Sequence, residues 1–207
     1  MKSSKFAITI SRQYGSGGLL ISKKLAKELK VSSYDKELIE IASKKSGVAG
    51  DFFSESKNKK GLWLLGNLTG FATNLLGFDN TDNNLDESVF EIQSKIIKAL
   101  ARKDSAVFVG RSADYVLRMH SNMISVFITA DMEDRVERIR KALGVSKEKA
   151  LKEIEKKDKS RAAYYEHYTG KVWGHAASYD LCVNSSVLGI NSTAKLVKSF
   201  VKEKLKI

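Results

Sequence analysis

The stretch FAITISRQYGSGGLLISKKLAKEL, residues 6–29, decides the fold of this chain. Residues 6–10 are apolar apart from one threonine and predict a buried strand. Residues 18–29 predict a helix, because apolar side chains recur at helical spacing, at Leu20, Ile21, Leu25 and Leu29. A glycine-rich turn joins the two. This order is typical of the start of a phosphate-binding site, where N–H groups of the turn and of the helix N-terminus face the anion.

The turn lacks the lysine of the usual phosphate loop, Gly-x-x-x-x-Gly-Lys-Ser/Thr, in which the lysine contacts the outer phosphates and the hydroxyl holds magnesium. The corresponding residues here are Arg12, Gln13, Tyr14, Gly15, Ser16, Gly17, Gly18 and Leu19. The glycines still permit a backbone cradle for phosphate. Arg12 is our candidate for the replacement cation, and Ser16 is the nearest hydroxyl. The alternative is a plain strand-to-helix turn without a ligand.

Composition indicates a soluble globular protein. The chain has 207 residues, of which 43% are hydrophobic and 29% charged, so we expect one domain, residues 1–207, with an insertion. The net charge of +12 favours anionic ligands. The lone cysteine, Cys182, excludes an internal disulfide, and no signal-peptide core follows Lys2 and Lys5. We therefore expect a cytoplasmic protein.

Strand and helix patterns alternate along the rest of the chain. Apolar runs predict further strands at residues 31–34, 106–110, 124–130 and 179–185. Helical spacing predicts helices at residues 35–47, 86–104, 131–144, 146–165 and 192–205. Strands that are apolar throughout and alternate with helices favour an α/β fold, with a parallel sheet covered on both faces.

Residues 48–85 interrupt this alternation and predict an insertion. Within it, residues 61–78 contain no charged side chain, while glycine, asparagine and threonine make the stretch a poor membrane span. We expect an apolar lid or a dimer surface there, with a membrane contact as the alternative. Our prediction is a homodimer with Trp63 and Phe71 at or near its interface.

Four segments together resemble the cytidylate kinase-like family of nucleoside monophosphate kinases. They are ITISRQYGSGG (8–18), YDKELI (34–39), VFVGRSADYVL (107–117) and YYEHYTGKVWGHAASYDLCVNSSVLGI (164–190). The resemblance implies a three-layer P-loop kinase-like fold with a five-stranded parallel sheet. It also implies an acceptor-binding insertion at about residues 48–85 and a lid at about residues 145–175. In this family a Ser-Arg-x-x-Gly-Ser-Gly-Gly loop replaces the usual form, so Gly18 resembles a feature of this branch.

The resemblance also assigns roles near the acceptor. Arg111 lies in GRSAD, where cytidylate kinases carry Gly-Arg-Asp, and is expected to bind the acceptor's phosphate or base; a surface ion pair is the alternative. Ser112 stands in place of that aspartate, and Asp114 is the candidate to compensate. Asp35 follows the second strand, where family members place an acidic residue near the acceptor, although it also suits a helix N-cap.

The lid is expected to contribute a pair, Asp158 and Arg161, which matches the family's Asp-x-x-Arg and shares one helix face, and Asp158 is expected to be among the substrate-binding residues. Phosphoryl transfer depends on cationic clamping, so we expect Arg12, Arg111 and Arg161 to be catalytic. One of three arginines on the preceding helix is expected to reach the phosphates: Arg135, Arg138 or Arg140. An aromatic cluster suits either base stacking or core packing: Tyr164, Tyr165, Tyr168 and Trp173.

The expected function is phosphoryl transfer from ATP, with Mg²⁺, to a small acceptor such as CMP or dCMP. Three histidines and one cysteine show no metal-ligand spacing, so no protein-bound metal site is predicted. One alternative is a nucleotide-binding sensor without catalysis, and another is a kinase for a different acceptor. A nucleic-acid-binding protein has only the charge and a few aromatic residues in its favour, without a recognition motif. We therefore expect nucleotide and acceptor as partners, with no specific nucleic acid and no membrane.

Overall fold

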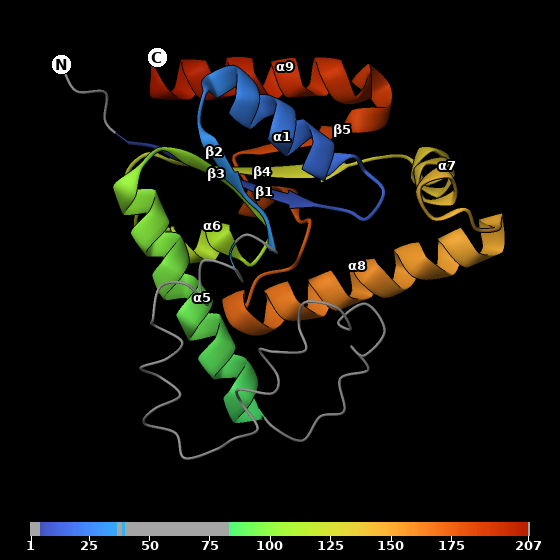
Figure 1. The fold of residues 1–207 in the computed structure, drawn as a ribbon, viewed down its shortest axis with the longest axis horizontal. Coiled ribbons are helices and arrows are strands. Elements are labelled where there is room, and N and C mark those ends of the chain that lie inside the picture. Colours follow the sequence, from blue (N-terminus) through green and yellow to red (C-terminus); the bar gives the residue numbers. More distant parts are fainter. Residues whose placement is uncertain (1–4, 37–38, 40–82, 207) are drawn as a thin grey trace. The chain divides into compact units, whose positions relative to one another are not determined.

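The computed structural model describes residues 5–36, 39 and 83–206, and Figure 1 shows their arrangement. The chain divides into two units, Met1–Lys36 with Ile97–Ile207 and Glu37–Ile96. The first unit contains the sheet and every predicted catalytic residue. The described part of the second is Ile39 and the first part of helix α5 (Asn83–Lys103), so the predicted insertion lies almost entirely outside the described residues.

The sheet has five parallel strands in the order β2-β3-β1-β4-β5. Their bounds are β1 (Ala7–Arg12), β2 (Ser32–Tyr34), β3 (Ala106–Val109), β4 (Met123–Thr129) and β5 (Leu181–Asn184). The predicted α/β class and parallel sheet are confirmed. From β1 the chain continues to β2 and β3, which lie on one side of β1, and later to β4 and β5, which lie on the other side. The carboxyl end of β1 is therefore a switch point, where open parallel sheets bind ligands.

The first unit's helices cover both faces of this sheet. Figure 1 shows α1 (Gly18–Leu29) and α9 (Ser185–Leu205) over one face, and α6 (Ala113–Val116) and α8 (Lys147–Thr169) on the other side. The remaining elements are α7 (Met132–Leu143) and the 3₁₀ turn η1 (Ala176–Ser178). None of the described helices is long and apolar enough to cross a membrane.

The two faces of β1 differ in chemistry. Ile8 and Ile10 belong to an aliphatic core beneath α1 and α9, which also includes Ile21, Leu25, Val107, Val109, Ile124, Val126, Ile128, Val197 and Val201. Alternation along the strand places Ala7, Thr9 and Ser11 on the opposite face, and all three are buried. The aliphatic face holds the sheet together, while the second face offers small and polar side chains to the segments that follow α8.

Two helix boundaries differ from the prediction by at least four residues, and one short helix was not predicted. Helix α8 runs past the predicted residue 165 to Thr169 and ends at Gly170, whose positive φ of 67° closes it. Helix α9 begins at Ser185 rather than 192, with a kink at Gly189, where the backbone leaves helical geometry. The short helix α6 was not predicted, because four residues are too few to show a period. The predicted helix 35–47 falls almost entirely outside the described residues.

Candidate functional site

The Arg12 side chain passes directly beside Gly18, the residue at the position of the missing lysine. A Cβ built at Gly18 would lie 2.6 Å from Arg12 Cβ, so the arginine stem crosses the α-carbon of the residue at the lysine position. A Cβ at Gly110, after β3, would lie 2.3 Å from an Arg12 guanidinium nitrogen. The usual loop begins with glycine and ends with the cation, whereas this phosphate loop (residues 12–18) has the cation first and glycine last.

Positive charge gathers around Arg12. Burial, followed by the nearby charges of Arg161 and Arg111, lowers the pKa of Arg12 to about 9, while Asp35 acts in the opposite direction. Arg12 therefore stays charged at neutral pH. Burial also lowers the pKa of Arg161. The three predicted catalytic arginines are thus brought together at the carboxyl end of β1, with Asp35 near enough to act on Arg12.

The lid pair contacts the phosphate loop rather than open space. The Tyr14 N–H donates to Asp158 at 2.7 Å, and the Arg161 guanidinium donates to the Arg12 carbonyl at 2.9 Å. Arg161 also lies 5.4 Å from the centre of the Tyr14 ring. Asp158 was predicted among the substrate-binding residues, and here its carboxylate fastens α8 to the loop.

Arg135 completes this attachment. Its side chain donates to the Tyr14 carbonyl at 2.8 Å and forms an ion pair with Asp158, and only 4% of it is exposed. Arg138 donates to the Gly15 carbonyl at 3.0 Å, whereas Arg140 pairs with Glu137 at the surface. Arg135 and Arg138 both hold the loop through its carbonyls, so both act behind the backbone that would face a phosphate.

The loop's other residues are held by α9 and β4. A Cβ at Gly17, where φ is 77°, would lie 2.1 Å from Ile190, so glycine is required there twice over. The Gln13 side chain accepts from the Thr129 hydroxyl. Ser16 is fully buried, and its hydroxyl accepts from the Gly18 N–H at 3.4 Å.

A phosphate group suits this loop better than a metal ion does. The loop opens into the N-terminus of α1, which favours anions. Leu19 stands where the magnesium hydroxyl is expected, and the Ser16 hydroxyl is turned into the loop. In the described part of the chain, no three His, Cys, Asp or Glu residues form a cluster able to hold a metal. The described loop residues therefore offer no side chain that is suited to bind Mg²⁺ directly.

Arg111 lies in a left-handed turn (residues 110–112). The φ angles of Gly110, Arg111 and Ser112 are 77°, 59° and 48°, and the Ala113 N–H closes the turn on the Gly110 carbonyl. Two consecutive non-glycine residues in this region are strained by about 1–2 kcal/mol each. Such strain is concentrated at functional sites. The turn aims Arg111 across the end of β3, with its guanidinium carbon 5.7 Å from the centre of the Tyr164 ring.

Asp114 does not project into the site. It is 6% exposed and accepts a hydrogen bond from the Tyr165 hydroxyl at 2.8 Å. Burial raises the pKa of Asp114, although the bond from Tyr165 partly opposes the rise. The Tyr179 ring stacks on the Tyr165 ring with 6.2 Å between their centres, and the Gly174 N–H donates to the Tyr179 hydroxyl at 3.5 Å. The buried bond between Tyr165 and Asp114 thus joins α8 to α6, which the sequence pattern did not reveal.

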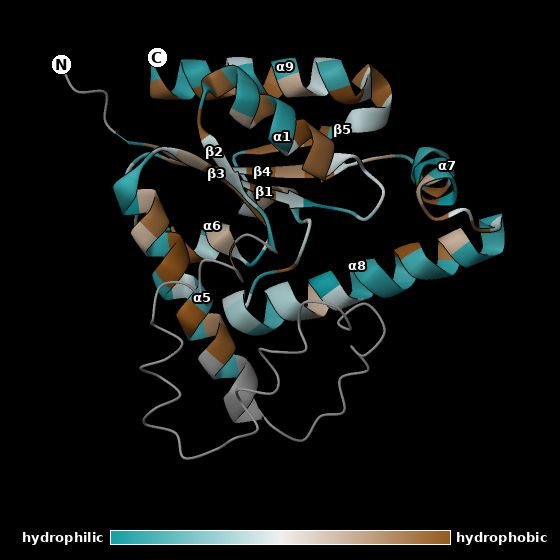
Figure 2. Cartoon of the chain, in the orientation of Figure 1, coloured by the Kyte–Doolittle hydropathy of each residue, from teal (hydrophilic) through white to brown (hydrophobic). Residues whose placement is uncertain are grey.

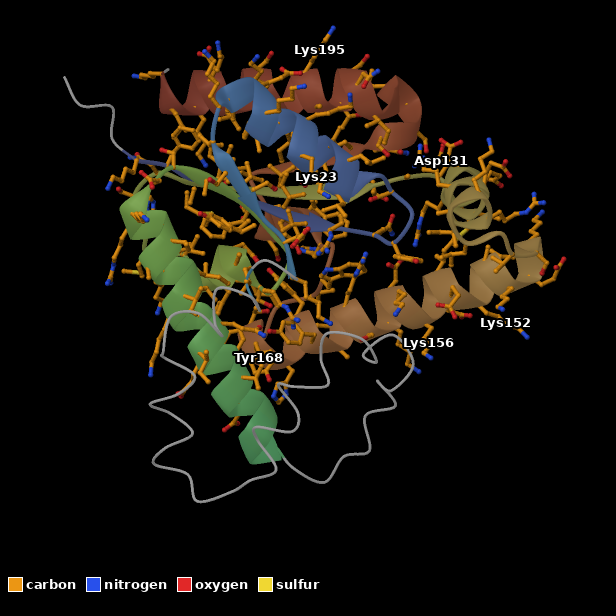
Figure 3. The ribbon with its side chains drawn as sticks, viewed as in Figure 1. Lys23, Asp131, Lys152, Lys156, Tyr168 and Lys195 are labelled. Atoms are coloured by element: carbon orange, nitrogen blue, oxygen red, sulfur yellow. The ribbon has the colours of Figure 1, made fainter. Side chains whose placement is uncertain are left out.

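The predicted aromatic cluster lies at the C-terminal end of α8 and just beyond it. Tyr165 is buried, while the Tyr164 and Tyr168 rings pack against each other at 4.8 Å. Trp173 packs edge-on against Phe127 of β4. Figure 3 shows Lys152 and Lys156 extending from α8 away from the sheet, and Figure 2 shows how hydrophilic this helix is.

The raised pKa of Asp114 predicts how stability depends on pH. Because its pKa is higher in the folded than in the unfolded chain, stability falls as pH rises from the usual aspartate range, about 4, through the raised folded value. Asp114→Asn keeps an oxygen for Tyr165 but cannot ionise. We expect the difference in Tm between this variant and the wild type to change in the variant's favour as pH rises. A difference that stays constant from acid to neutral pH would contradict the assignment.

Comparison with known proteins gives one family and similar relatives. Residues 7–187 match the model of the cytidylate kinase-like family. A cytidylate kinase of Ignicoccus hospitalis is 26% identical over 191 residues, covering 92% of this chain and 96% of that protein. A cytidylate kinase of Methanosarcina mazei is also 26% identical, covering 86% of each. The similarity therefore spans both the phosphate loop and the lid helix.

Solved structures agree on the fold. A protein from Eubacterium ventriosum, described as uncharacterized, has a TM-score of 0.73 at 26% identity and covers 96% of this chain and 99% of its own. A shikimate kinase from Bacteroides thetaiotaomicron has a TM-score of 0.52 at 15% identity, with 99% and 100% covered. The second likeness is one of fold alone.

Proposed function

The chain belongs to the cytidylate kinase-like family, and we propose that it is an ATP-dependent phosphotransferase that delivers the γ-phosphoryl group to a small acceptor. The observation that carries this proposal is the convergence of Arg12, Arg111 and Arg161 at the end of β1. Burial, and after it the positive charges of Arg161 and Arg111, lower the pKa of Arg12, and a bound polyanion would offset the repulsion among the three arginines. Catalysis of phosphoryl transfer needs this kind of positioned positive charge.

Each arginine has a distinct place in the proposed reaction. Arg12 reaches from the loop toward Gly110 and would contact the transferred phosphoryl group from the strand side. Arg161 is oriented by its bond to the Arg12 carbonyl and would stabilise charge that develops during transfer. Arg111 extends from the left-handed turn and would bind the acceptor. The loop N–H groups and the α1 N-terminus would hold the remaining phosphates. Magnesium would supply charge neutralisation on the nucleotide's own phosphates.

CMP or dCMP is the acceptor that we propose first. The support is the name of the relatives and the position of Arg111 after β3. The replacement of the family's aspartate by Ser112, together with the burial of Asp114, separates this turn from the Gly-Arg-Asp form. A kinase for a different small acceptor is therefore the alternative within the same chemistry.

A second candidate function, a nucleotide sensor without catalysis, is favoured by one contact. Asp158 accepts the Tyr14 N–H, a loop group that would otherwise be available to a phosphate. A carboxylate in this place would oppose an incoming anion unless α8 moved. In that case nucleotide binding would report on the position of the lid helix.

Titration calorimetry with ATP and Mg²⁺ tests the nucleotide site. We expect wild-type protein to bind and Arg12→Gln to bind at least ~10-fold more weakly, since a hydrogen bond to a charged group contributes about 1.5–3 kcal/mol. Lys23→Gln, on an exposed part of α1, is the matched control and should bind normally. Equal affinity in Arg12→Gln would remove the assigned role of Arg12.

The homodimer remains a prediction, because residues 61–78, with Trp63 and Phe71, lie outside the described residues. Replacing Leu65 and Leu68 with aspartate should convert a dimer into monomers, since unpaired charges in an apolar interface cost several kcal/mol. Light scattering measures both states. A wild type that is already a 23.0 kDa monomer at micromolar concentration would refute the dimer.

A further inference from the structure

One face of α8 contacts both the phosphate loop and the segment next to the left-handed turn. Ile154, Asp158, Arg161 and Tyr165 follow one another at spacings of four, three and four residues, so they lie along a single stripe. Ile154 packs in the small core between α7 and α8. Asp158 and Arg161 bind the phosphate loop, and Tyr165 binds Asp114 next to the left-handed turn.

The spacing along this stripe is fixed by helix geometry. Seven residues separate Asp158 from Tyr165, which corresponds to about 10 Å along the axis. Both anchor points are hydrogen bonds to groups that are otherwise buried or part of the loop backbone. A rigid helix that is fastened at two points cannot shift at one of them without straining the other.

The anchor at Tyr165 is well supported on the inside of the protein. Its hydroxyl donates to Asp114, the second residue of α6, and the Tyr179 ring stacks on the Tyr165 ring with 6.2 Å between their centres. Tyr179 in turn packs against Phe127 of β4, with 5.1 Å between the ring centres. Losing the Tyr165 hydroxyl would leave Asp114 buried without this bond, in a turn that already holds two strained residues.

We propose that Tyr165 and Asp114 are positioning residues that fasten the lid helix to the left-handed turn, so that a change at the phosphate loop is transmitted to Arg111. This inference rests on the proposed function for what binds at the two ends. It gives Asp114 a role inside the protein, in place of the predicted contact with substrate. It also explains why a helix that is polar along most of its length buries a tyrosine near its end.

Hydrogen exchange on the free protein tests the anchor without any ligand. The amides of Tyr115, Val116 and Leu117 bond to the carbonyls of Ser112 and Ala113, so they report on the turn. We expect Tyr165→Phe to speed their exchange about fivefold or more, as the loss of one hydrogen bond allows. Exchange in β1 and β4 should not change. Tyr115→Phe, on α6 itself, is the matched control and should leave the rates as they are.

Two substitutions at Asp114 separate the loss of the hydrogen bond to Tyr165 from the effect of replacing a side chain of this size. Asp114→Asn retains an acceptor for the Tyr165 hydroxyl and should exchange like the wild type at these amides. Asp114→Leu, of similar size, should exchange like Tyr165→Phe. The proposal is overturned if the two variants behave alike, or if Tyr165→Phe is no different from Tyr115→Phe.

The non-hydrolysable analogue AMP-PNP with Mg²⁺ tests the transmission. In the wild type we expect protection of residues 13–18 and, in addition, of the Tyr115 to Leu117 amides. In Tyr165→Phe the protection of residues 13–18 should persist, and the protection of the Tyr115 to Leu117 amides should disappear. Equal protection of the turn amides in both proteins overturns the transmission. Absence of protection at residues 13–18 in the wild type instead counts against the proposed function, and the ligand-free exchange then decides the anchor alone.

Discussion

Arg12→Ala is expected to lower turnover at least ~100-fold, the scale of removing one oriented electrostatic donor from a transition state. The expectation follows from the position of the Arg12 side chain, whose stem passes Gly18 and whose guanidinium lies against Gly110, where the sheet's central strands end. Negative charge develops on the reacting groups in the transition state, where Arg12 would stabilise it. The substitution should therefore lower kcat more than it weakens substrate binding. ADP release with saturating acceptor measures it.

The control for this experiment is Arg140→Ala. Arg140 lies on α7 in a surface pair with Glu137, away from the loop, so its loss should leave kcat within about twofold. If Arg12→Ala and Arg140→Ala had the same kcat, the positive charge at Arg12 would not serve the reaction. Thermal unfolding of both variants separates lost chemistry from lost folding.

The second large effect concerns Gly18, which stands where the usual phosphate loop has its lysine. Gly18→Lys restores the residue of the usual phosphate loop, yet we expect it to lower turnover at least ~100-fold. The new Cβ would fall 2.6 Å from Arg12 Cβ and displace the arginine stem. The added lysine therefore removes the existing cation from its place instead of supplementing it.

The double variant Arg12→Gly with Gly18→Lys makes this test specific. It removes the obstructing stem and gives the loop a glycine first and a lysine last, as in the usual form. We expect turnover at least ~10-fold above that of Gly18→Lys alone, which is strong non-additivity between residues in contact. If the two losses simply multiplied, the steric account of Gly18 would be wrong.

The sequence was sufficient for the parts of the site that are local along the chain. The strand, the loop and α1 follow one another within 24 residues, and their patterns predicted the strand, the turn and the helix that the structure shows. Asp158 and Arg161 were also identified as a pair. Their partners were not, because Tyr14 and Asp158 are 144 positions apart and only the folded chain brings them together.

Other features could not be found in a pattern. The left-handed φ of Arg111 and Ser112 has no residue signature, since neither is the glycine that such angles favour. Arg135 resembles its exposed neighbours on a charged helix, and only burial distinguishes it. The bond between Tyr165 and Asp114 likewise joins an aromatic cluster to a turn, two segments that sequence analysis treated separately.

Acceptor-dependent transfer of the γ-phosphoryl group tests the central claim most directly. Purified wild-type protein would be incubated with radiolabelled ATP, Mg²⁺ and each of a panel of nucleoside monophosphates and other small acceptors, and the labelled products separated. The account predicts label on at least one acceptor, with CMP or dCMP first, and its loss in Arg12→Ala. Saturable binding of ATP without label on any acceptor would contradict the kinase and favour the sensor.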